Sequence, residues 1–140
     1  MKNLTRLMII GVLAAGPCFI SPIASAQPIT CGGVHGASVA GLRGIAFGDP
    51  PVGSTSGAVI ESINPPSPFL PARIPSGGTF TPELGDMITE VNGIPISCVG
   101  SLMNAMNSVL ASTSVRPVLV SFTIRQARFG TSVTISAVIS

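Results

Sequence analysis

The period of the hydrophobic pattern changes along the second half of the chain. Short apolar runs lie on both sides of Asn92-Gly93, and apolar runs over residues 118–124 and 133–138 have the character of half-buried strands. Between them, apolar residues recur at intervals of three and four positions, as on one face of a helix: Leu102, Met106, Val109 and Leu110. Ser97 or Ser101 is expected to cap this helix. The pattern predicts a mainly β chain of the α+β class with one clear amphipathic helix.

A tight hairpin turn is predicted at Asn92-Gly93. A two-residue type I′ turn requires two successive residues with positive φ, and asparagine followed by glycine meets this requirement. Upstream, Asp86 is expected to accept hydrogen bonds from the backbone N–H groups just after it. We assign a structural role to Gly85, Asp86, Asn92 and Gly93.

The order of these elements resembles a PDZ domain. Residues 85–96, GDMITEVNGIPI, match the core that PDZ domains carry before their second helix, while residues 57–63 and 117–125 are similar to the preceding and following strands. The resemblance covers residues 41–139 and is closest to the bacterial form, found in periplasmic trypsin-like proteases and in secretion-system components. It implies a partly open barrel of five or six strands flanked by one helix, whose last strand takes the place of the first strand in the animal arrangement.

The resemblance also implies a peptide-binding groove. Residues 42–47 are similar to the PDZ carboxylate-binding loop and the strand that follows it, where backbone N–H groups converge on a ligand carboxylate and an extended peptide adds as a strand. The implied loop and strand residues are Leu42, Arg43, Gly44, Ile45, Ala46 and Phe47. The implied helix residues are Ser101, Ala105 and Ser108. The alternative interpretation is an ordinary strand start with a solvated arginine, beside a helix face that binds no ligand.

Residues 64–84 depart from the family pattern. This segment contains six prolines and a pair of glycines where most PDZ domains have a short helical turn. Such proline density favours extended backbone, so we predict an extended loop with no more than a helical turn at 69–74. Its apolar side chains either pack onto the barrel in place of the missing helix or form a lid or partner surface: Phe69, Leu70, Ile74 and Phe80.

Residues 1–26 are predicted to be a cleaved signal peptide. A basic start and an apolar run over residues 7–20 precede Ala24-Ser25-Ala26, which fits the small-x-small rule and places cleavage between Ala26 and Gln27. The competing interpretations are an uncleaved anchor, for which the run is shorter than the roughly 20 residues that span a bilayer, and lipidation at Cys18. We expect a periplasmic or secreted protein.

Cleavage leaves a tail at 27–40 and one domain at 41–140 that contains the proline-rich loop. In this part of the chain five arginines balance five acidic residues, and lysine is absent. Binding to duplex nucleic acid requires clustered basic residues, so the composition argues against a nucleic-acid partner. We also expect no membrane insertion after cleavage.

Two cysteines, Cys31 and Cys98, follow the predicted cleavage site. In an oxidising compartment an even pair favours a disulfide. A bridge between them would close a long loop, worth roughly 4 kcal/mol by the chain-entropy argument. Two unrelated thiols or a redox-active pair are the alternatives, although the chain has no Cys-x-x-Cys motif.

The sequence argues against catalysis and against a bound metal or cofactor. His35 is the only histidine, whereas a metal site needs three or four ligands and a serine hydrolase needs a nucleophile elbow that the chain lacks. The acidic residues show no paired spacing suited to acid–base chemistry. We interpret His35 as a solvated loop residue and predict that the protein is not an enzyme.

These features predict a binding module, an adaptor that captures an extended protein or peptide segment, C-terminal or internal, by strand addition. The alternatives are a structural docking component of an envelope machine, such as a secretion or pilus assembly, and an accessory regulator of a periplasmic protease. The state of the groove separates the first two. A binding module needs an open edge with free backbone N–H groups, whereas a docking component can have that edge covered by the proline-rich loop.

Overall fold

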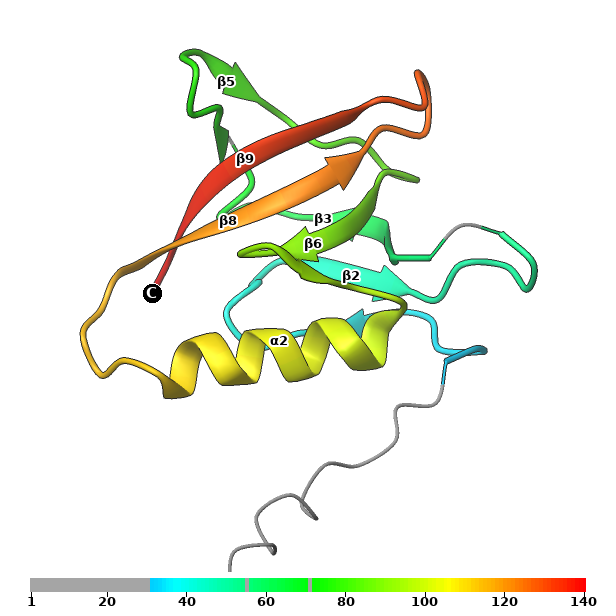
Figure 1. Ribbon diagram of the computed structural model, residues 1–140, viewed down its shortest axis with the longest axis horizontal. Coiled ribbons are helices and arrows are strands. Elements are labelled where there is room, and N and C mark those ends of the chain that lie inside the picture. Colours follow the sequence, from blue (N-terminus) through cyan, green and yellow to red (C-terminus); the bar gives the residue numbers. More distant parts are fainter. Residues whose placement is uncertain (1–30, 55, 71) are drawn as a thin grey trace, which may run out of the picture.

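The computed structural model describes residues 31–54, 56–70 and 72–140 (Figure 1). The predicted signal peptide and its cleavage site lie outside the described residues. An antiparallel sheet packs against one helix, α2 (Val99–Ala111). This arrangement confirms the predicted α+β class.

The sheet combines five longer strands with four strands of two residues. The longer strands are β2 (Ile45–Gly48), β3 (Ala58–Ile63), β6 (Met87–Val91), β8 (Val118–Arg125) and β9 (Ser132–Ile139). The short strands are β1 (Ala37–Ser38), β4 (Ala72–Arg73), β5 (Thr79–Phe80) and β7 (Ile94–Pro95). The strand order is β1-β2-β3-β6-β8-β9-β4-β5, with β7 paired to β6. The sheet is therefore open, with β1 at one end and β5 at the other.

The turn between β6 and β7 confirms the predicted hairpin. Asn92 and Gly93 both have positive φ, 49° and 82°, and Val91 pairs with Ile94 across the turn. The side chain of Asn92 also accepts a hydrogen bond of 2.8 Å from the N–H of Ser121. The turn residue thus fixes the hairpin to the neighbouring strand β8.

Asp86 is buried, and its carboxylate accepts hydrogen bonds from residues on both sides of it in the chain. Its carboxylate accepts hydrogen bonds from the N–H groups of Glu83, at 2.8 Å, and Ala127, at 2.9 Å. The first donor lies three positions before Asp86, and the second lies 41 positions after it, beyond the end of β8. Asp86 therefore ties the start of β6 to the loop between β8 and β9.

The helix has the predicted apolar face, but its N-cap residue is Cys98 and neither of the two predicted serines, because Ser101 already lies in the first turn. The Ser101 Oγ accepts hydrogen bonds from the N–H groups of Ser97 and Cys98, at 2.8 and 3.1 Å. The buried helix residues are Val99, Leu102, Ala105 and Met106, while Val109 and Leu110 are partly buried against the core.

The proline-rich segment contributes to the core, as one of the two interpretations expected. Phe69 is fully buried, and its ring meets that of Phe122 edge-on with centroids 4.9 Å apart. The predicted helical turn at 69–74 is wrong, because β4 and β5 form a short hairpin here and β4 pairs with β9 through Arg73 and Ser136. The hairpin extends the sheet at the position where proline density excludes a helix.

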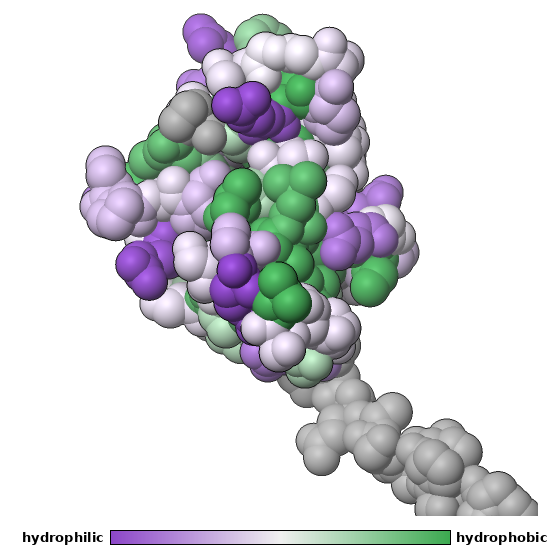
Figure 2. Space-filling model, turned by 90° about the vertical axis from the view of Figure 1, so that its left-hand side faces the viewer, coloured by the Kyte–Doolittle hydropathy of each residue, from purple (hydrophilic) through white to green (hydrophobic). Residues whose placement is uncertain are grey.

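The hairpin of β8 and β9 has one face in the core and one outside. Phe122, Ile135 and Ile139 are fully buried on the inner face. On the outer face, Leu119 and Val138 are cross-strand partners and are 66% and 55% exposed. Figure 2 views the side of the molecule where β8 begins and β9 ends, and hydrophobic side chains gather in the middle of this face.

Candidate functional site

The predicted carboxylate-binding segment forms a tight turn whose apolar residues face the core. Leu42, Ile45 and Phe47 are almost completely buried, and the N–H of Ile45 donates to the carbonyl of Leu42 at 3.3 Å. Gly44 has a φ of +81°, and a Cβ atom there would lie 2.2 Å from the carbonyl oxygen of Asn64. Glycine is required at this position, since any side chain would collide with the backbone after β3.

The outer edge of β2 is already paired. β1 lies antiparallel to it, with Ala37 opposite Phe47 and Ser38 opposite Ala46. In Figure 1, β1 is the blue strand between β2 and α2. The chain itself thus occupies the edge at which the resemblance places a bound peptide. The covering element is the segment before the turn, and not the proline-rich loop, whose hairpin of β4 and β5 lies at the opposite end of the sheet order.

Side chains alternate along the occupying segment as they would in a bound strand. Ala37 is half-buried against the core, Ser38 is exposed and Val39 is 5% exposed. After them, Gly41 lies between β9 and α2, because a Cβ atom there would be 2.8 Å from Ile139 Cγ2 and 3.2 Å from Met106 Cε. The segment is therefore packed into the sheet-helix interface and not merely laid over it.

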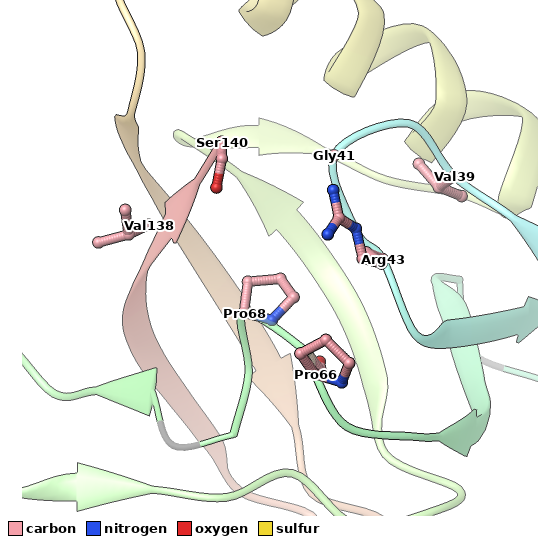
Figure 3. Close-up of a pocket in the computed structure, with 8 residues that line it drawn as sticks. Val39, Gly41, Arg43, Pro66, Pro68, Val138 and Ser140 are labelled. Atoms are coloured by element: carbon pink, nitrogen blue, oxygen red, sulfur yellow. The ribbon is translucent and has the colours of Figure 1, made fainter.

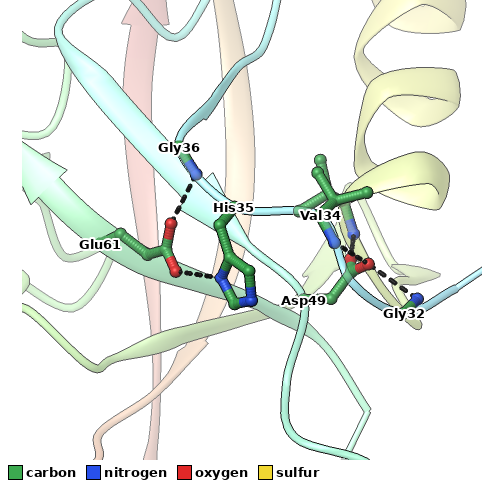
Figure 4. Close-up of polar contacts among 7 residues, drawn as sticks. Gly32, Val34, His35, Gly36, Asp49 and Glu61 are labelled. Carbon is green, nitrogen blue, oxygen red and sulfur yellow. Dashed lines mark hydrogen bonds and ion pairs between the residues drawn. The ribbon is translucent and has the colours of Figure 1, made fainter.

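Asp49 fixes the beginning of this segment (Figure 4). This buried carboxylate accepts hydrogen bonds from the N–H groups of Gly32, at 2.7 Å, and Val34, at 3.1 Å. Its other oxygen accepts from the N–H of Val99, the first residue of α2, at 2.9 Å. Burial alone would raise the pKa of Asp49, but these three backbone hydrogen bonds outweigh burial and hold the pKa below its ordinary value. The Asp49 carboxylate therefore connects the N-terminal tail to the start of α2.

Glu61 fixes the middle of the segment from β3. Its carboxylate accepts hydrogen bonds from His35 Nδ1, at 2.7 Å, and from the N–H of Gly36, at 2.6 Å (Figure 4). These two hydrogen bonds, that from His35 first, lower the pKa of Glu61. His35 is 67% exposed, as expected for a loop residue, but it is paired with Glu61 and not simply solvated.

A disulfide between Cys31 and Cys98 closes the tail onto the body of the protein. The two Cα atoms are 5.6 Å apart and the bridge spans 67 residues. Cys98 is buried and directly precedes α2. The disulfide prediction is confirmed. Together with Asp49 and Glu61, the disulfide holds residues 31–36 in place. We call residues 31–39 the N-terminal strap.

The sequence interpretation missed Asp49 and Glu61. Each of them binds backbone groups of the glycine-rich stretch at 32–36, from 15 to 25 positions away. A stretch with several free N–H groups and few side chains is a suitable partner for a carboxylate, and this was the available signal. The local sequence does not show which of the five acidic residues bind this stretch, because that depends on the fold.

The three predicted helix residues have different environments. Ser101 lies in the first turn and accepts a hydrogen bond from the N–H of Cys98, Ala105 is 6% exposed in the core and Ser108 is exposed. Of the loop residues, Arg43 is exposed and lines a cavity of about 260 Å³, on the side of the proline-rich segment (Figure 3). The structure thus places Ala105 in the same core as the buried residues of the turn and of β2, whereas Arg43 and Ser108 are exposed.

No cluster of three or more metal-ligating side chains occurs among residues 31–54, 56–70 and 72–140. Within the same residues, no helix has both the length and the apolar character needed to cross a bilayer. Comparison of the chain with known protein families and with curated proteins gives no match.

Proposed function

We propose that the protein is a non-catalytic, PDZ-type module that binds an extended protein segment by adding it as a strand to β2. In the resting, disulfide-bonded form, the N-terminal strap occupies this position. The observation that carries the proposal is β1 itself, an antiparallel strand between β2 and α2 that leads into the turn at 42–45. A site that accommodates one strand has the backbone geometry to accommodate another.

The strap also indicates which side chains the site accepts. Val39 is buried beside the turn and Ala37 is half-buried two positions before it, while Ser38 faces outward. A partner strand would place alternate side chains into the same two positions. We therefore expect a ligand with a small residue and then a branched apolar residue in this spacing.

Binding requires the strap to leave. Its ladder with β2 spans only two residue pairs, but both ends are held, one by the disulfide and one by the buried turn. A competing segment on the same chain acts at an effective concentration of the order of millimolar. Reduction of the disulfide releases one end and lowers this competition, so we expect the site to open in the reduced form.

A docking component of an envelope machine is the second candidate. The covered edge of β2 favours it, because such a protein would use other surfaces and the strap would stay in place. Both candidates place the protein in the periplasm or outside the cell, where a disulfide persists. They differ in whether the strap is ever displaced.

The test is a titration of the chain starting at Gln27 with a fluorescent peptide that copies residues 32–39 and has a free C-terminus. We expect binding to the reduced protein and to Cys31→Ser at least about tenfold tighter than to the oxidised protein, since only the strap's tether differs. Loss of binding on amidation of the peptide would assign carboxylate recognition to the turn at 42–45. No binding in either redox state, by a folded protein, would reject strand addition and leave the docking alternative.

A further inference from the structure

The outer face of β8 and β9 carries an apolar pair that the fold does not require. Leu119 and Val138 lie directly opposite each other and remain more than half exposed. On the outer face of an antiparallel sheet, polar side chains are the usual choice because that face contacts water. Two apolar partners side by side form a patch, in contrast to a single exposed hydrophobic residue, and such patches mark contact surfaces.

This patch is the floor of a groove. The hairpin of β4 and β5 stands beside it, closed by the hydrogen bond from the N–H of Ile74 to the carbonyl of Gly78 at 3.1 Å. Between hairpin and strands lies a cavity of about 540 Å³. We call it the proline groove, defined by Pro68, Ile74, Pro75, Leu119 and Val138.

The proline groove continues into the smaller cavity that Arg43 lines. The two cavities share Pro68 and Val138, so they are adjacent parts of one depression. Figure 3 shows Pro66 and Pro68 on one side of the smaller cavity, with Val138 and Ser140 on another and Arg43 near Gly41. The groove therefore extends from the β4–β5 hairpin to the turn before β2.

The two charged side chains along this depression are both arginines. Arg73 lines the larger cavity and Arg43 the smaller one, and no aspartate or glutamate lines either. Within the described residues neither arginine forms an ion pair, since the ion pair found there joins His35 and Glu61. The groove thus combines an apolar floor with two arginines, of which Arg73 lines the larger cavity and Arg43 shares the smaller one with Ser140, the last residue of the chain.

Three of the five acidic residues are used elsewhere, and the other two, Glu83 and Glu90, line neither cavity. Asp49 and Glu61 hold the strap, and Asp86 holds the start of β6. Complementarity therefore requires the negative charge to come from a partner. The concave shape, with Pro68 and the Ile74–Gly78 turn rising beside Leu119 and Val138, fits a chain segment better than a flat lipid surface.

We propose that the proline groove is a docking surface for an extended segment of a partner protein, with apolar side chains between acidic ones. The apolar residues would cover Leu119 and Val138, and the acidic residues would pair with Arg43 and Arg73. This surface is separate from the edge of β2 and remains available while the strap is in place. It therefore does not depend on strand addition.

The test uses a synthetic octapeptide with acidic residues at both ends and leucine and valine between them, acetylated and amidated so that no terminal carboxylate is present. Titration into the oxidised protein, followed by NMR, should shift the signals of β9 and the β4–β5 hairpin. The analogue with amides in place of the acids should bind more weakly, by up to about fivefold for each ion pair lost, which is the upper end of what an exposed ion pair contributes. Shifts confined to β1 and β2 would instead indicate strand addition and overturn the groove proposal.

Charge reversal sharpens the test. Arg73→Glu should weaken binding of the acidic peptide about tenfold and strengthen binding of a basic version, because the sign of the groove's charge changes. Arg125→Glu is the matched control, an exposed arginine on β8 that lines neither cavity. Equal effects of the two variants, or binding of the protein to anionic lipid vesicles but not to the peptide, would refute a peptide-docking groove.

Discussion

At the edge of β2, backbone groups that a partner strand would use are paired with the protein's own strap, whereas in the proline groove apolar side chains of β8 and β9 remain uncovered. The first surface is hydrogen-bonded, cross-linked and closed. The second has no acidic lining and no strand over it in the described structure. Occupancy of the expected site therefore does not make the molecule inert, because an exposed edge and an exposed apolar face are separate means of recognition.

More specific interactions hold the strap on the edge of β2 than hold the wall of the proline groove. A two-pair ladder is too short to be stable alone, and a disulfide with two carboxylates supplements it. The open groove has no comparable support, since its wall is a short hairpin joined to β9 through one residue pair, Arg73 with Ser136. Changes to the strap should therefore alter stability, and changes to the groove should leave it almost unaltered.

The largest effect is expected from removing the disulfide. The double variant Cys31→Ser, Cys98→Ser should lose about 4 kcal/mol of unfolding free energy, because the bridge restricts a long loop of the unfolded chain. Urea unfolding of the variant and of the oxidised protein measures this difference. Added reductant should destabilise the parent protein by a similar amount and leave the variant unchanged. An unaltered urea midpoint would mean that the bridge contributes no stability.

The next largest effect is expected from Asp49→Ala. This change removes the acceptor for Gly32, Val34 and Val99 and should cost about 2–3 kcal/mol, as the helix start loses a partner together with the strap. Amide hydrogen exchange should show faster exchange over residues 36–38. Glu83→Ala removes the same charge at an exposed position and serves as the control. Unchanged exchange over 36–38 would contradict the role of Asp49 in holding the strap.

The contribution of Asp49 to the unfolding free energy should decrease as the pH falls. Its pKa is lower in the folded than in the unfolded protein, so its contribution is fully present above the unfolded value of about 4 and is lost as pH falls through the lower folded value. The difference in unfolding free energy between the parent and Asp49→Ala should be constant above about pH 5 and shrink below about pH 4. A difference that grows on acidification would reverse the assigned sign.

The parts of this structure that depend on neighbouring residues could be predicted from the sequence. The turn at Asn92-Gly93 and the apolar helix face follow from local chemistry, and the disulfide could be predicted because two of the three cysteines follow the predicted cleavage site. Residues 37 and 38 lie in the predicted tail, and their pairing with β2 could not be predicted, because two-residue ladders leave no periodic signal.

The anchors and the groove depend on contacts between distant segments. Asp86 illustrates the limit, since its two partners lie on opposite sides of it in the chain and one is 41 positions away. Arg73 and Leu119 likewise come together only through the pairing of β4, β9 and β8. The hairpin within the proline-rich segment could not be predicted from proline density, which excludes a helix but does not select a strand partner.

The smallest effect on stability is expected in the groove, and it completes the comparison. Val138→Ser should change the unfolding free energy by less than about 0.5 kcal/mol, because the side chain is 55% exposed. The neighbouring Ile139→Ala, fully buried on the inner face, should cost about 2–4 kcal/mol in the same urea assay. If Val138→Ser destabilised the protein as much as Ile139→Ala, the outer pair would serve the fold. If Val138→Ser left stability unchanged but weakened binding of the acidic peptide, the exposed apolar pair at 119 and 138 would be explained by its role in binding.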